Sequence, residues 1–148
     1  MKISAKGRYG LAAMVFLAKA CQSDNPTTIL TISENLGISK IYLEQVFSLL
    51  KHAHLVTSSK GSQGGYQLAK QPQEISSWDV LSAIELPLTE KTAASVEEKR
   101  PELERALQSA VYEPLDESVR TALQKTTLRD LLEETNRQKS EENLMYFI

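Results

Sequence analysis

Apolar side chains recur every three or four residues along the first fifty positions, which is the spacing of amphipathic helices. The pattern predicts a first helix from residue 4 to about residue 20, ended by the turn sequence Asp24-Asn25-Pro26. A short second helix is expected after the capping residue Thr28, and Gly37 follows it where a tight turn needs a positive φ angle. The inward positions of these two helices are Leu11, Met14, Val15, Ala18, Ile29, Ile32 and Leu36.

A third helix is predicted to begin after Ser39 and to run through the sequence SKIYLEQVFSLLKHA. Its apolar residues fall on one face, so the other positions point to solvent and offer hydrogen-bonding groups that suit base edges and phosphates. Two short helices joined by a turn at Gly37 form a helix-turn-helix, although an ordinary helical hairpin has the same pattern. The inward face consists of Leu43, Val46, Phe47 and Leu50, and the outward face of Lys40, Ile41, Glu44, Gln45, Ser48 and Lys51.

The stretch SKGSQGGYQLAK, residues 59–70, contains three of the six glycines and lies between two strand-compatible runs. Such a stretch could cradle a phosphate in a nucleotide enzyme, or it could form the tip of a β-hairpin. A phosphate-binding loop requires a helix immediately after the glycines, but Tyr66-Gln67 continues as a strand, which favours the hairpin. Three helices followed by a hairpin form a winged helix, in which the third helix reads DNA and the hairpin, or wing, lies beside it.

The rest of the chain divides into a helix, a linker and a second helical part. A capping box of Ser76 and Asp79 predicts a fourth helix, which completes a DNA-binding domain over residues 1–85. Residues 86–100 are charged and have no apolar period, which indicates a linker. Residues 101–148 are expected to form a dimerisation helix, a short C-terminal helix and an apolar tail.

The dimerisation helix is predicted from an apolar residue at every fourth position after Pro101, and Pro114 should kink it without breaking it. Because this stripe lies outside a domain that has its own core, we expect it to pack against a second copy of the chain; the alternative is that it folds back as a cap. The fold class is therefore mainly α, a winged helix-turn-helix with a long dimerisation helix. The stripe consists of Leu103, Leu107, Val111, Leu115, Val119 and Leu123.

Charge is divided unevenly between the two halves. The first 70 residues contain eight Lys and Arg against three Asp and Glu, whereas the remaining 78 contain nine against sixteen. A basic half suits a polyanion such as double-stranded DNA.

The sequence predicts a cytoplasmic protein without membrane contact. It has a single cysteine, its start lacks the apolar core of a signal peptide, and no apolar run approaches the ~20 residues that span a bilayer. No catalytic triad, metal site or paired carboxylates have supporting context, so an enzyme is not expected.

Four segments together resemble the Rrf2 family of bacterial winged-helix regulators: MKISAKGRYGL, ISENLGISKIYLEQVFSLLK, HLVTSSKGSQGGYQLAK and TTLRDLL. The opening segment and the C-terminal MYFI are most similar to the branch that represses cysteine metabolism. The resemblance implies a homodimeric repressor that places the YLEQ helix in a major groove and the wing in the adjacent minor groove. In the cysteine branch, repression can also depend on a partner enzyme of cysteine synthesis.

The resemblance and the chemistry of the side chains agree on the candidate contacts. Glu44 can accept a hydrogen bond from cytosine, Gln45 can pair with adenine, and Ile41 can contact a thymine methyl group. Lys60 is assigned to the minor groove by the resemblance, and basic or hydroxyl side chains elsewhere would bind phosphates. The full set of candidate DNA contacts is Lys6, Arg8, Ser39, Lys40, Ile41, Tyr42, Glu44, Gln45, Ser48, Lys51, Lys60, Gly64, Gly65 and Tyr66.

The signal that such a regulator answers is less well defined. Many family members bind an iron-sulfur cluster through three closely spaced cysteines between the fourth helix and the long helix, but residues 86–105 contain no cysteine or histidine. We therefore expect no cluster and no other cofactor. Cys21 is a candidate redox switch, although a buried structural cysteine is the commoner case. A thiol- or ligand-responsive regulator of other genes and a protein-binding adaptor remain alternatives.

Overall fold

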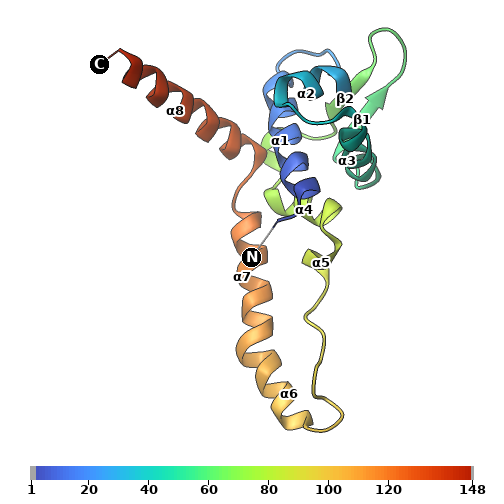
Figure 1. Cartoon of the computed structure of the whole chain (residues 1–148), viewed down its shortest axis with the longest axis vertical. Coiled ribbons are helices and arrows are strands. Elements are labelled where there is room, and N and C mark those ends of the chain that lie inside the picture. Colours follow the sequence, from blue (N-terminus) through green and yellow to red (C-terminus); the bar gives the residue numbers. More distant parts are fainter. Residues whose placement is uncertain (1–2, 148) are drawn as a thin grey trace.

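The N-terminal half forms the expected winged helix in the computed structural model, which describes residues 3–147 (Figure 1). Helices α2 and α3 are joined by the turn at Gly37, and β1 and β2 pair antiparallel in a register that sets Val56 opposite Leu68. An isolated bridge from Thr27 to Tyr66 fastens the wing to the segment before α2. The elements of this half are α1 (Ala5–Ala20), α2 (Ile29–Leu36), α3 (Lys40–His52), β1 (Val56–Ser59) and β2 (Gly65–Leu68).

Local signals define the helix-turn-helix as predicted. The Thr28 hydroxyl accepts a hydrogen bond from the Thr31 N–H at 3.1 Å, which satisfies one free donor at the start of α2. Gly37 has a φ angle of 67°, a left-handed conformation that side chains disfavour, and its N–H donates to the Ser33 carbonyl. The turn therefore fixes the direction in which α3 leaves α2.

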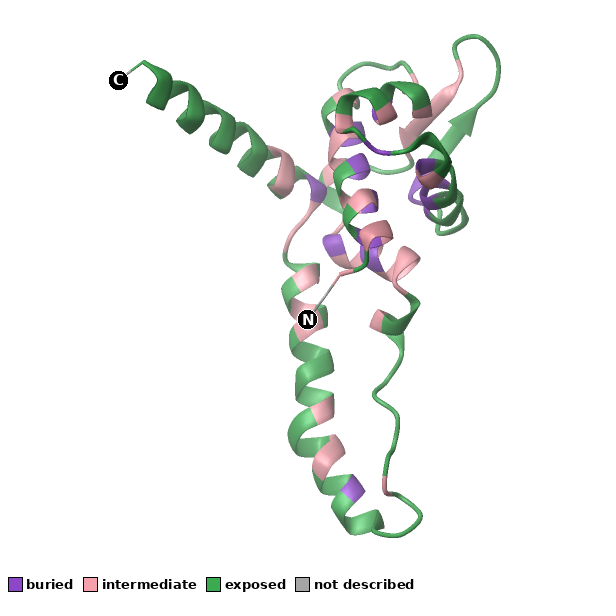
Figure 2. Cartoon of the chain, viewed as in Figure 1, coloured by how far each residue is buried: buried purple, intermediate pink, exposed green. Residues whose placement is uncertain are grey.

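The core lies between α1, α2, α3 and α4 (Ser77–Ile84) (Figure 2). All four apolar residues predicted for the inward face of α3 are buried. The prediction for α1 was incomplete. Leu11 and Val15 pack against the core but are only half-buried, whereas Ala13 and Leu17, which it did not name, are buried. Helix α1 contacts α3, α4, β2 and the C-terminal helix α8 (Leu128–Tyr146), so neighbours on several sides bury a wider face of α1 than one stripe.

The end of α3 is a Schellman motif with an unusual residue at its centre. The Leu55 N–H donates to the Leu50 carbonyl and the His54 N–H to the Lys51 carbonyl, both at 3.0 Å. His54 has a φ angle of 60°, the left-handed region that glycine occupies without cost. The chain therefore carries local strain at this position.

Replacing His54 by glycine should relieve that strain and stabilise the domain by about 1 kcal/mol. Thermal unfolding should then shift upward by about 3 °C, as measured by circular dichroism. His52→Gly is the matched control, because His52 is the last residue of α3 and glycine inside a helix destabilises by about 1 kcal/mol. Equal shifts in both variants would contradict the assignment of strain to His54.

The segment after the wing contains more helix than the expected linker. The predicted capping box of α4 is present, since the Asp79 N–H donates to the Ser76 hydroxyl at 3.1 Å and the Ser76 N–H donates to the Asp79 carboxylate at 2.8 Å. A single turn, α5, then occupies the start of the interval that the sequence assigned to a linker. The elements are the 3₁₀-helix η1 (Pro72–Glu74), α4 (Ser77–Ile84) and α5 (Leu86–Thr89).

The long helix is continuous through Pro114, as predicted, and a π-helical segment absorbs the proline. The Glu113 N–H donates to the Gln108 carbonyl, five residues back, so the ladder is already widened where the proline supplies no donor. The Arg120 guanidinium lies 5.3 Å from the centre of the Trp78 ring and links this helix to α4. The segments are α6 (Pro101–Leu107), η2 (Gln108–Tyr112) and α7 (Glu113–Gln124).

The C-terminal helix corrects two expectations. Helix α8 (Leu128–Tyr146) has 19 residues, where a short helix and a tail were predicted. Its start belongs to the N-terminal core, because Leu128 is fully buried and its N–H donates to the Ile75 carbonyl at 2.9 Å. Most of the remaining length is exposed, and the Arg137 ion pairs with Glu134 and Glu141 support it as a helix (Figure 2).

No helix among residues 3–147 combines the length and the apolar character that crossing a membrane would need.

Candidate nucleic-acid interface

The outward face of α3 presents polar side chains beside the wing. Helix α3 and the β1–β2 hairpin lie on the same side of the molecule, away from α8 (Figure 1). Ile41 is 70% exposed although it is apolar, and the Ser39 hydroxyl makes no capping bond at the start of the helix. The other exposed candidates on this face are Lys40, Glu44, Gln45 and Ser48.

Two tyrosines among the candidate contacts are used for packing. The Tyr42 ring meets the Tyr9 ring of α1 edge-on, with centroids 5.2 Å apart, and the Tyr66 ring lies 4.6 Å from the Phe47 ring. Both tyrosines are half-buried. They hold α3 and the wing against the core, a positioning role that the sequence did not reveal; Tyr9 itself was missed, although it lies in the KGRYG segment.

The structure separates the expected phosphate-binding cations into two groups. The Lys51 ammonium donates to the Ser58 hydroxyl at 2.7 Å and so connects α3 to β1, and the Arg8 guanidinium donates to the Ile3 carbonyl at 2.7 Å. Lys6 is half-buried, whereas Lys40 and Lys60 are exposed. Lys51 and Arg8 are also exposed, but their side chains are engaged within the protein, which leaves Lys40 and Lys60 as the cations most available to DNA on this face.

Ion pairing leaves the basic half of the chain without internal compensation. Within residues 3–147, ion pairs form only at Arg100, Arg129 and Arg137, all in the C-terminal half. The described basic side chains of the first 70 residues therefore keep their charge available to an external anion, which strengthens the field around α3 and the wing.

Two glycines of the wing are required by close contacts. A Cβ atom at Gly65 would lie 2.5 Å from the Thr27 carbonyl oxygen, and its φ angle is 148°. A Cβ atom at Gly64 would lie 2.5 Å from the Ser59 carbonyl oxygen. These glycines shape the wing and have no side chain to offer DNA, so their contribution to binding is conformational.

Cys21 directly follows α1 and is exposed. The expectation of a buried structural cysteine was wrong for this chain, because α1 ends at Ala20 and Cys21 begins the exposed turn of residues 21–25. An exposed thiol is accessible to oxidants.

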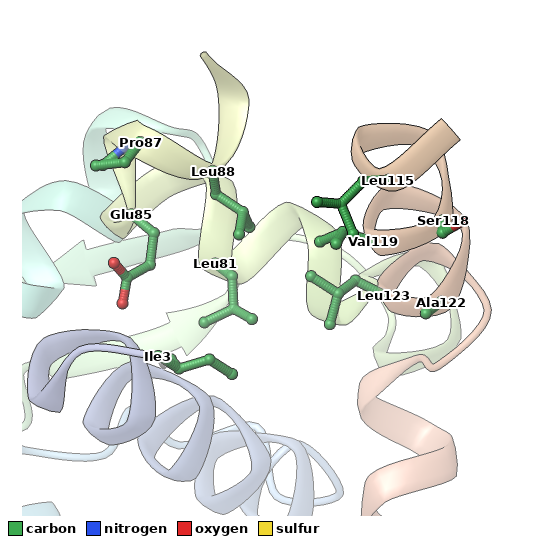
Figure 3. A pocket seen from close by; sticks show the side chains of 10 residues that line it. All are labelled: Ile3, Leu81, Glu85, Pro87, Leu88, Leu115, Ser118, Val119, Ala122 and Leu123. Carbon is green, nitrogen blue, oxygen red and sulfur yellow. The ribbon is translucent and has the colours of Figure 1, made fainter. Parts of the chain in front are cut away.

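An apolar groove separates the long helix from the DNA-binding domain (Figure 3). It encloses about 470 Å³, and the Glu85 carboxylate at its edge accepts a hydrogen bond from the Ser4 N–H at 2.7 Å. On the same helix, Leu103, Val111 and the groove-lining Leu115 are 45%, 49% and 54% exposed. The groove is lined by Ile3, Leu81, Glu85, Pro87 and Leu88 on one wall and by Leu115, Ser118, Val119, Ala122 and Leu123 on the other.

Comparison with known proteins places this architecture in a family. Residues 3–134 match the model of the Rrf2 family, described as an iron-dependent transcriptional regulator. The transcriptional regulator CymR of Bacillus subtilis is 38% identical over the full length of both chains. Its structure, described as that of the global cysteine regulator of B. subtilis, has a TM-score of 0.71 and covers 90% of this chain and 98% of that one.

Two further structures share the fold. IscR of T. potens is 32% identical, with a TM-score of 0.71 over 91% of this chain and 88% of that one. The oxidised form of Staphylococcus aureus CymR is 36% identical, with a TM-score of 0.69 over 90% of this chain and 97% of that one.

The residues of this chain do not fit the iron that the family description names. Thiolates normally hold iron-sulfur clusters, and the only cysteine of the sequence, Cys21, is in the DNA-binding half. Within the described residues, no three His, Cys, Asp or Glu side chains are grouped so that they could hold a metal ion.

The family match covers most of the chain and includes the helix-turn-helix, the wing and the long helix. The full-length identity to CymR and the structural likeness to CymR and IscR agree with it. The chain belongs to the Rrf2 family and is a DNA-binding transcriptional regulator.

Proposed function

We propose that this regulator is a cytoplasmic, homodimeric repressor that reads a specific operator and is not an enzyme. The observation that carries the proposal is the exposed outward face of α3 beside a glycine-shaped wing, in the basic half of the chain. The described basic side chains of that half take part in none of the ion pairs of residues 3–147. Glu44, Gln45 and Ile41 would contact base edges, and Lys40 and Lys60 would contact phosphates or the minor groove.

The homodimer is supported by the apolar stripe of the long helix. Large apolar side chains that remain half exposed along a helix would be covered by a second copy of the same surface. The adjoining groove extends this surface toward the DNA-binding domain (Figure 3). A dimer would place two α3 helices for consecutive major grooves of one operator.

Genes of cysteine or sulfur metabolism are the proposed targets. The support is the full-length identity to CymR, whose structure is described as that of a global cysteine regulator. The proposed repressor works without an iron-sulfur cluster, since its single cysteine cannot supply a thiolate set. The partner would be an enzyme of cysteine synthesis, and the exposed apolar side chains at the end of α8 are available to a protein: Leu144, Met145, Tyr146 and Phe147.

A second candidate is a thiol-responsive regulator, because Cys21 is exposed in this chain and a related CymR has been crystallised in an oxidised form. In this version oxidation of Cys21 would release DNA, and the Cys21→Ser variant would bind DNA equally well with and without peroxide. If oxidant weakens DNA binding by the wild type and by the variant alike, this candidate is excluded.

Purified protein should select a small set of genomic fragments whose shared sequence has two-fold symmetry. The half-sites should be about one helical turn, or ~34 Å, apart, because a dimer presents two recognition helices. Affinity should fall steeply with salt, with a slope of about −0.9 for each phosphate neutralised. Sequencing of the bound fragments and gel retardation over a salt series measure both properties.

Random genomic DNA of equal length is the control for this experiment. Equal affinity for random and selected fragments would contradict operator reading, and no retardation even at low salt would leave the protein-binding adaptor as the better description.

A further inference from the structure

Glu104 in α6 is a charged side chain that is almost completely buried, with 3% of its surface exposed. One carboxylate oxygen, Oε2, accepts hydrogen bonds from the Ser95 N–H at 3.0 Å, the Val96 N–H at 2.9 Å and the Ser95 hydroxyl at 3.2 Å. These three donors all belong to the loop that runs back along the long helix between α5 and α6 (Figure 1). A single oxygen atom thus fastens the loop to the helix.

The second oxygen extends the connection along the helix. Glu104 Oε1 accepts from the Gln108 side-chain amide at 3.0 Å, and the same amide nitrogen lies 3.3 Å from the Thr92 carbonyl oxygen, to which it also donates. The Thr92 N–H and hydroxyl in turn donate to the Asp116 carboxylate at 3.3 to 3.4 Å. The loop is therefore held at two points along the long helix. Its residues Ser95 and Val96 are bound by Glu104 of α6, and its residue Thr92 is bound by Asp116 of α7.

None of the four donors to Glu104 carries a charge, so the buried carboxylate is compensated by neutral hydrogen bonds and has no ion-pair partner among the described residues. The Val96 N–H, followed by the Ser95 N–H, lowers the pKa of Glu104 below its ordinary value. The carboxylate is ionised at neutral pH, and the loop must keep its two N–H groups aimed at it. The burial of an ionised Glu104 therefore depends on the folded loop, and the folded loop depends on the carboxylate that accepts its N–H groups.

We propose that Glu104 is a metal-free latch that fixes the loop of residues 92–96 to the long helix, at the corner where the family resemblance would place an iron-sulfur cluster. The loop offers hydroxyl and backbone groups and no thiolate, and the carboxylate of Glu104 alone supplies the acceptor that these groups meet. The latch is built from the chain's own residues, so the closed form of this corner does not depend on iron.

Glu104→Gln is the sharpest test because it keeps the size of the side chain. A glutamine that keeps its carbonyl oxygen on the loop N–H donors turns its NH₂ group toward Gln108. Gln108 must then flip its own amide and give up its bond to the Thr92 carbonyl, and the loop donors meet a neutral oxygen, which is a weaker acceptor than a carboxylate. Hydrogen exchange at the Ser95 and Val96 amides should become about 10- to 100-fold faster, the range expected for lost hydrogen bonds to a charged group. Glu102→Gln is the matched control, since Glu102 is exposed and pairs only with the flanking Arg100.

The amides of α3 report whether the effect is local. They should keep their protection in Glu104→Gln, and Glu104→Asp, which retains the charge on a shorter side chain, should show intermediate loop exchange. Adding ferrous ion to the wild type should leave the exchange of residues 92–96 unchanged.

Three results would overturn the latch: loop exchange in Glu104→Gln equal to the Glu102→Gln control, simultaneous loss of protection in α3, or slower loop exchange of the wild type with ferrous ion. No DNA is present in these measurements, so a failure of the proposed operator binding would not affect them.

Discussion

Replacing Leu115 by glutamate should convert the proposed dimer into monomers and lower the apparent affinity for operator DNA by about 100-fold or more. Leu115 is 54% exposed at the centre of the apolar stripe and also lines the groove beside α4. A carboxylate there would have to be buried without a partner when a second copy docks, which is strongly unfavourable. Monomers would engage one half-site each and lose the gain, typically 10²- to 10⁴-fold, that linkage of two binding units provides.

Sedimentation velocity gives the oligomeric state of this variant, and gel retardation with a selected operator gives its affinity. Glu117→Gln is the control, because Glu117 is an exposed polar residue of the same helix outside the stripe. A Leu115→Glu protein that remains dimeric with unchanged affinity would place the dimer contact elsewhere. The groove would then be open to a small ligand, the other way in which such a regulator could receive a signal.

The sequence predicted those parts of the fold in which the spacing of apolar residues and the capping residues at the helix ends indicate the same element. The inward face of α3, the Gly37 turn and the Ser76 capping box all combine such signals, and each is present in the structure. Helix α8 has no apolar stripe along its outer part, so its length could not be recognised from period. Capping at Thr127 and ion pairs three and four residues apart maintain this helix in solvent.

The sequence predicted which side chains of α3 face solvent, because only one face of that helix is free. It did not predict contacts between segments that are distant in the sequence. Once the core face of α3 is assigned, Lys40, Gln45 and Ser48 must point outward. The bond from Lys51 to Ser58 depends on the position of β1, which no spacing within α3 reveals. The burial of Glu104 was also missed, because a carboxylate in a charged segment is expected in solvent unless its partners are known.

Two variants, Gln45→Ala and Lys60→Ala, should distinguish the two contributions to DNA binding. The first should lose sequence discrimination, and the second should lose attraction to the phosphates. Gln45 is an exposed amide on the outward face of α3, and a bidentate contact to adenine contributes about 1–3 kcal/mol of discrimination. Because a dimer makes this contact once in each half-site, its loss should weaken operator binding by about 2–6 kcal/mol, which is roughly 30-fold or more, while non-specific binding is unchanged. Selectivity should fall at one base pair per half-site. Retardation of operators substituted at each position would locate that base pair.

Lys60→Ala should give the opposite pattern, because an exposed ammonium at the wing tip attracts the backbone without reading sequence. Operator and random DNA should both bind more weakly, and the salt slope of a dimer should become shallower by about 2, one phosphate for each wing. Ser62→Ala, at an uncharged exposed position of the same loop, is the control. If Lys60→Ala leaves the affinity and the salt slope unchanged, the wing does not approach DNA, and α3 alone must supply the contacts.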